Sequence, residues 1–122
     1  MEWTVKKIIK GMNFVSTFAR AKAMKRRIPL ALFFLITEKC NLRCPYCYVR
    51  FQNLSSEELP TETIIRTIDE FYALGTRYIC IMGGEPLLYP ELDRIASHLS
   101  SLNIFSDIIT NGLLIHKQIE AL

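Results

Sequence analysis

Three cysteines, Cys40, Cys44 and Cys47, lie within one short segment of the 122-residue chain and are its strongest chemical signal. Thiolates are the usual protein ligands of iron–sulfur clusters, and three on one loop can bind one compact cluster. A [4Fe–4S] cluster would then keep one iron open to another ligand. Zinc is an alternative, although structural zinc sites usually have four ligands and neither histidine lies near this segment. A redox pair of Cys44 and Cys47 would leave Cys40 unexplained.

Two other segments carry unusual residues directly after an apolar run. The sequence Gly83–Pro86 (GGEP) follows residues 78–82, and Thr110–Gly112 (TNG) closes residues 104–110. The cysteines likewise follow the apolar run 30–37. Because the carboxyl ends of parallel strands meet at one edge of a sheet, we expect these three segments to form one site. Taken alone, GGEP and TNG could each be an ordinary turn.

The elements that position these segments alternate along the chain. The three apolar runs have strand length, and helical periodicity fills residues 60–74 and 90–103 between them. The run 30–37 is apolar without alternation, which predicts a strand buried on both faces. Residues 2–19 predict a first helix, and a last helix begins near residue 114. This order predicts an α/β fold of parallel strands joined by right-handed crossovers. Cys80, inside the second run, is expected to be a buried core residue.

Charge is distributed unevenly along the chain. Residues 1–27 hold eight basic side chains and one acidic, a balance of +7 within a net charge of +3. The remainder is therefore acidic, and we expect no nucleic-acid partner. No apolar run reaches the roughly 18 residues of a membrane-spanning helix. Clustered cysteines without an obvious signal peptide favour a reducing, cytoplasmic compartment.

The basic segment 1–29 is expected to be a helical unit separate from residues 30–122. Trp3 and Phe18 lie near one apolar face of its helix. Three interpretations remain open: a helix that covers an open end or side of the predicted fold, a peripheral contact of residues 1–27 with an anionic membrane, and an organelle transit peptide.

The segment Cys40–Cys47 (CNLRCPYC) resembles the CxxxCxxC signature of the radical S-adenosylmethionine (SAM) superfamily. GGEP resembles the second motif of that family, and TNG resembles a segment frequent in members with a C-terminal auxiliary-cluster domain. The resemblance covers roughly residues 30–115. It implies a partial (β/α) barrel, of which residues 30–122 would form about the first three βα units as a truncated core.

The resemblance also implies a role for each site residue. Cys40, Cys44 and Cys47 would bind three irons of a [4Fe–4S] cluster, and SAM would chelate the fourth through its amino and carboxylate groups. The implied SAM contacts are Tyr46 beside the adenine, Gly83, Gly84 and Glu85 at the methionine ammonium with Pro86 fixing the turn, and, more weakly, Thr110 and Asn111.

The implied activity is reductive cleavage of SAM to a 5′-deoxyadenosyl radical, which abstracts hydrogen from an unidentified substrate. The implied electron donor is a reductant such as flavodoxin or ferredoxin. The alternative is a non-enzymatic iron–sulfur or zinc module that acts with a partner protein. Because three βα units are fewer than this family usually has, we expect a fragment with an unprotected apolar sheet, and therefore poor solubility or dependence on a partner.

Overall fold

The computed structural model describes residues 2–48 and 57–118 of the chain. The polar connection expected from Ser55, and the last helix beyond residue 118, lie partly outside these ranges. The elements are α1 (Glu2–Ala23), β1 (Ala31–Thr37), α2 (Thr61–Leu74), β2 (Tyr78–Gly83), the short 3₁₀ helix η1 (Pro86–Leu88), α3 (Leu92–Ser101), β3 (Phe105–Ile108) and α4 (Ile115–Gln118).

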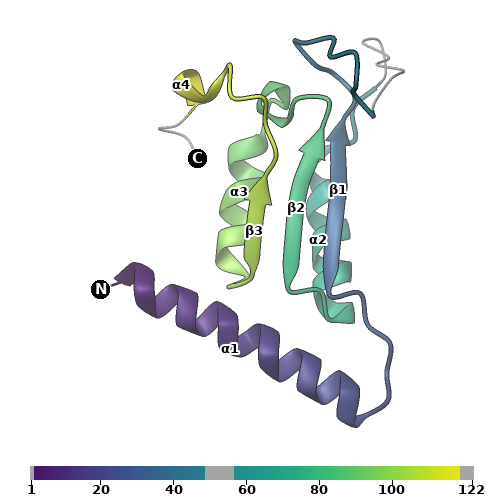
Figure 1. The fold of residues 1–122 in the computed structure, drawn as a ribbon, viewed down its shortest axis with the longest axis vertical. Coiled ribbons are helices and arrows are strands. Elements are labelled where there is room, and N and C mark those ends of the chain that lie inside the picture. Colours follow the sequence, from purple (N-terminus) through teal and green to yellow (C-terminus); the bar gives the residue numbers. More distant parts are fainter. Residues whose placement is uncertain (1, 49–56, 119–122) are drawn as a thin grey trace.

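The three strands form one parallel sheet in the order β1-β2-β3. Ala31 pairs with Tyr78, and Tyr78 pairs with Phe105, so the strands begin level with one another. Helices α2 and α3 lie together on one side of this sheet (Figure 1). The strand–helix alternation expected from the sequence is confirmed, and the architecture is a three-stranded portion of a (β/α) barrel.

The core lies between the sheet and helices α2 and α3. It consists of Ile36, Ile64, Ile68, Ile79, Ile81, Leu87, Tyr89, Leu92, Ile95, Leu99 and Ile104. Helix α2 ends where the sequence predicts, because Gly75 adopts a left-handed conformation with φ of 117°. The amide of Gly75 donates to Tyr72 O and that of Thr76 donates to Phe71 O, which satisfies the last carbonyls of the helix.

The prediction that the first strand is buried on both faces is wrong for this chain. Phe33 and Leu35 are 59% and 45% exposed, whereas Leu32 and Phe34, on the other face, pack against the core. An unbroken apolar run indicates that both faces suit burial, but in the described ranges the helical core packs against one face of β1 alone. Cys80 lies in β2 opposite Phe33 and is buried as expected.

Helix α1 crosses the molecule near the amino-terminal ends of the strands (Figure 1). Asn13 attaches it to the rest of the chain, because its Oδ1 accepts from Arg77 Nε at 3.1 Å and its Nδ2 donates to Asn103 O at 3.5 Å. Several apolar side chains of α1 are exposed to solvent, among them Met12 at 67%. No helix within the described ranges has the length and apolarity needed to cross a membrane. The separation of segment 1–29 as a unit stays a prediction.

Candidate functional site

Backbone hydrogen bonds bring the ends of the three strands to one edge. The amide of Gly84 donates to Thr37 O at 2.8 Å, and the amide of Glu85 donates to Lys39 O at 2.7 Å. Beyond β3, the amide of Ile109 donates to Ile81 O at 2.9 Å. The expectation that the cysteine loop, GGEP and TNG share one edge is therefore confirmed.

The two glycines of GGEP allow β2 to approach the start of the cysteine loop. A Cβ on Gly83 would lie 2.6 Å from Thr37 O, and one on Gly84 would lie 2.7 Å from Glu38 O and closer still to Lys39 O. Backbone oxygens cannot yield as a flexible side chain can, so only glycine fits either position. The motif predicts a ligand contact for these glycines, but it does not indicate that both pack against the end of β1 and the start of the cysteine loop.

The Glu85 side chain is fully buried and points into the interior of the protein. Its carboxylate accepts from the Leu87 amide at 2.9 Å, the Thr110 hydroxyl at 2.7 Å and the Asn111 amide at 2.8 Å. A buried carboxylate needs such donors. The Glu85 carboxylate therefore joins GGEP to TNG, and its expected contact with the methionine ammonium stays a prediction.

TNG reaches across to the cysteine loop. Asn111 Nδ2 donates to Asn41 Oδ1 at 2.7 Å, and Asn111 Oδ1 accepts from the Leu113 amide at 3.0 Å. The Thr110 hydroxyl also accepts from the Gly112 amide at 3.0 Å. The side chains of Thr110 and Asn111, both predicted SAM contacts, therefore help to hold TNG against GGEP and the cysteine loop. The sequence did not indicate this role for Asn41, whose position beside Cys40 is its only local signal.

We expect a loss of about 1–3 kcal/mol in the free energy of unfolding when Glu85 is replaced by Gln. The new amide nitrogen would have to face buried donors where a carboxylate oxygen now accepts. Urea unfolding of the metal-free chain measures this, and Glu70→Gln, on the exposed side of α2, serves as the matched control. Equal stability of both variants would contradict a stabilising role of the buried Glu85 carboxylate.

Cys40, Cys44 and Cys47 are free thiols, each half-buried. The Leu42 amide donates to Cys40 Sγ at 3.4 Å, and the Cys47 amide donates to Cys44 O at 3.1 Å, which forms a turn between two of the cysteines. Tyr46 is 85% exposed in this turn.

These residues fit an iron–sulfur cluster by the chemistry of their donors. The loop offers three thiols, and an amide already points at one sulfur, as in cluster sites. Within residues 2–48 and 57–118, no three His, Cys, Asp or Glu side chains are grouped as ligands of a single ion. A tetrahedral zinc site would need a fourth ligand beside these three cysteines, whereas a [4Fe–4S] cluster can be held by three thiols with one iron left open.

One polar pair lies near α1 on the face of the sheet that is opposite α2 and α3. Tyr78 donates its hydroxyl to Asp107 Oδ2 at 2.9 Å. This hydrogen bond, with some burial and the negative charge of Asp107, raises the pKa of Tyr78 to about 12. The phenol therefore stays protonated at neutral pH and remains a donor to Asp107.

Comparison with known proteins identifies the class to which this site belongs. The family model described as the radical SAM superfamily matches residues 34–122. The chain therefore belongs to the radical SAM superfamily, whose cofactors are a [4Fe–4S] cluster and SAM.

Individual relatives agree with this assignment. A probable GTP 3′,8-cyclase of Archaeoglobus fulgidus is 38% identical over 96 residues, which are 79% of this chain and 32% of the relative. A PqqA peptide cyclase of Methylorubrum extorquens is 35% identical over 86 residues, 70% of this chain and 22% of the relative. The chain thus spans about a third or less of the length of these curated relatives.

The fold is similar to that of a solved protein, SuiB of Streptococcus suis. Streptococcus suis SuiB bound to the precursor peptide SuiA has a TM-score of 0.72 and 26% identity, over 88% of this chain and 25% of SuiB. SuiB bound to SAM has the same TM-score and identity over 85% of this chain and 25% of SuiB.

Proposed function

We propose that this chain is the cluster-binding part of a radical SAM enzyme. The observation that carries the proposal is the shared strand edge, where the cysteine loop is hydrogen-bonded to GGEP and to TNG. A plain metal-binding module needs no glycine-only turn packed beside its cysteines. That feature favours the enzyme over a zinc or electron-transfer module.

In this proposal Cys40, Cys44 and Cys47 each hold one iron, and the fourth iron takes SAM. When bound, these cofactors supply reductive cleavage of SAM to a 5′-deoxyadenosyl radical and hydrogen abstraction from the substrate. Gly83 and Gly84 offer backbone carbonyls to the methionine ammonium, since the carboxylate of Glu85 is used within the chain.

The remaining SAM contacts are proposed at the open side of the loop. The exposed ring of Tyr46 provides an aromatic surface for the adenine. Pro86 begins η1 and fixes the direction of the turn after Glu85. Thr110 and Asn111 act here by holding TNG against the cysteine loop.

The substrate of the whole enzyme stays open, because its relatives are named for a nucleotide and for a peptide. We propose a flavodoxin or ferredoxin as electron donor, since cleavage of SAM consumes an electron that the cluster must receive. A cytoplasmic location would supply such a reductant.

Anaerobic reconstitution with iron and sulfide tests the proposal. The reduced chain is expected to give the electron paramagnetic resonance (EPR) spectrum of a [4Fe–4S] cluster, and added SAM is expected to change that spectrum by binding to the open iron. Uptake of zinc alone would overturn the proposal, as would a cluster spectrum that SAM leaves unchanged.

We also propose that α1 binds the surface of an anionic membrane through its outward apolar side. Its outer stripe consists of Val5, Ile8, Ile9, Met12 and Val15, each 45% to 67% exposed. At 3.6 residues per turn, Arg20 and Lys22 border this stripe on opposite sides. The +7 balance of residues 1–27 complements anionic headgroups.

Replacing Met12 and Val15 together by Glu is expected to weaken binding to phosphatidylglycerol vesicles about tenfold or more, because it puts two charges into the stripe. Vesicle flotation measures this, with phosphatidylcholine vesicles as the control for apolar binding elsewhere. Equal flotation of both proteins would contradict the proposal, and so would self-association that the double substitution abolishes without any vesicle binding.

A further inference from the structure

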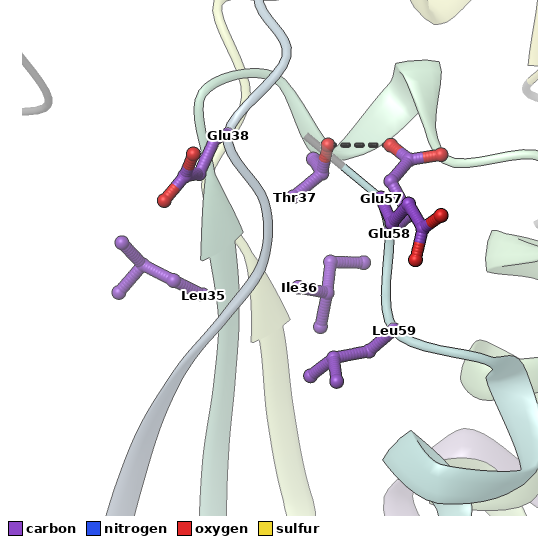
Figure 2. A pocket seen from close by; sticks show the side chains of 7 residues that line it. All are labelled: Leu35, Ile36, Thr37, Glu38, Glu57, Glu58 and Leu59. Carbon is purple, nitrogen blue, oxygen red and sulfur yellow. Dashed lines mark hydrogen bonds between the residues drawn. The ribbon is translucent and has the colours of Figure 1, made fainter. Parts of the chain in front are cut away.

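We infer that Glu58 is a positioning residue that holds the start of the cysteine loop in place. The inference rests on the proposed function, because it concerns how the cluster ligands are presented. Glu58 Oε1 accepts a hydrogen bond from the Thr37 hydroxyl at 2.6 Å (Figure 2). Glu58 Oε2 lies 3.1 Å from Lys39 Nζ. Both carboxylate oxygens thus engage the residues that lead directly into Cys40.

The contact is sheltered from water. Thr37 is 5% exposed, and the side chains of Glu58 and Lys39 are 16% and 36% exposed. Glu58 lines a cavity of about 220 Å³ beside the end of β1, together with Leu35, Ile36, Thr37, Glu38, Glu57 and Leu59 (Figure 2). A charge-assisted hydrogen bond in such a place is screened less than a surface ion pair.

The same short segment is held from its other side by GGEP. Thr37 O accepts from Gly84, and Lys39 O accepts from Glu85. The Thr37 hydroxyl also accepts from the Lys39 amide at 3.1 Å, which curls the chain toward Cys40. GGEP therefore holds the backbone of Thr37 and Lys39, while Glu58 holds their side chains.

Glu58 also stands at the far end of the segment that carries the cysteines. Thr37 precedes Cys40, Glu58 follows Cys47, and the two partners are 21 positions apart in the chain. Their contact brings the two ends of this segment together, so the conformational entropy of loop closure is already lost before a cofactor binds. Ligands that are pre-positioned in this way bind with a smaller ordering cost.

The carboxylate of Glu58 is distinguished from its neighbours by its partners. Glu38 and Glu57 line the same cavity, but both are exposed and neither is a partner of Thr37 in the way that Glu58 is. Lys39 provides the compensating positive charge for Glu58. Glu57→Gln is therefore a matched control: it removes one carboxylate from this cavity without touching Thr37 or Lys39.

Thiol alkylation of the metal-free full chain tests the inference, with rates resolved for each cysteine by peptide mass spectrometry. Glu58→Ala is expected to raise the rate at Cys40 about threefold to tenfold, the size expected for the loss of one sheltered hydrogen bond. Buried Cys80 should keep its rate. Glu58→Gln keeps an acceptor for Thr37, so its Cys40 rate should lie between those of the native chain and Glu58→Ala. Glu57→Gln should have the Cys40 rate of the native chain.

Thr37→Val removes the other half of the same contact. It should raise the Cys40 rate as Glu58→Ala does, and the double variant should be no faster than either single one. An unchanged Cys40 rate in Glu58→Ala would overturn the inference. A parallel rise at Cys80 would overturn it as well, because Glu58 would then support the whole fold. Since no cofactor is present, the result does not depend on whether the chain binds a cluster.

Discussion

Replacing Cys44 by Ser is expected to reduce cluster content from about four irons per chain to near zero after anaerobic reconstitution. A serine hydroxyl is not deprotonated at neutral pH and is a poor ligand for iron. The two remaining thiols would then have to hold the cluster without the central ligand of the loop. Cys40→Ser and Cys47→Ser should have the same effect, because each is proposed to bind a different iron.

Cys80→Ser is the matched control for these three variants. Cys80 is buried within β2, paired with Phe33 and Asp107, and it lies outside the cysteine loop. Iron analysis and the EPR spectrum of each reconstituted variant measure the outcome. A Cys44→Ser protein with full iron content, or a Cys80→Ser protein that folds and has none, would contradict the assignment of the ligands.

The second large effect is expected from Gly84→Ala, which should cost about 3 kcal/mol in the free energy of unfolding. The new Cβ would lie 2.7 Å from Glu38 O and closer still to Lys39 O. Both are backbone atoms at the start of the cysteine loop, so the strands would have to separate. Cluster uptake should fall with stability, because the same movement displaces Cys40.

Gly11→Ala provides the control for this substitution. Nothing lies within 4 Å of a Cβ at Gly11, which is in the middle of α1. Alanine there should raise stability by about 0.5–1 kcal/mol, since glycine is a poor helix former. Urea unfolding of the metal-free chains measures both effects. A Gly84→Ala chain as stable as the native one would show that the two segments are less tightly packed than described.

Much of the fold could be predicted from the sequence because its signals are local. The predicted strands 30–37, 78–82 and 104–110 correspond to β1, β2 and β3, although β3 is shorter. Gly75 ends α2 as expected, since a left-handed residue is least costly there. The meeting of the motifs at one edge followed from parallel topology alone.

What could not be predicted depends on residues far apart in the sequence. Asn111 and Asn41 are 70 positions apart, and neither carries a local sign of the pairing. Glu85 was assigned to a ligand because its charge suits an ammonium, but its direction depends on donors from Thr110 and Asn111. Glu58 looked like part of a polar connection, and only the fold brings it to Thr37.

The two ends of the sheet should differ in their tolerance of random mutation. At the carboxyl end, Gly83 and Gly84 leave no room for a side chain. At the amino end, α1 is attached through Asn13 and Arg77, and much of its surface meets solvent. A deep mutational scan read out by folding would therefore show a steep gradient along the strands. Affinity tags and fusion partners belong on the tolerant side, ahead of α1.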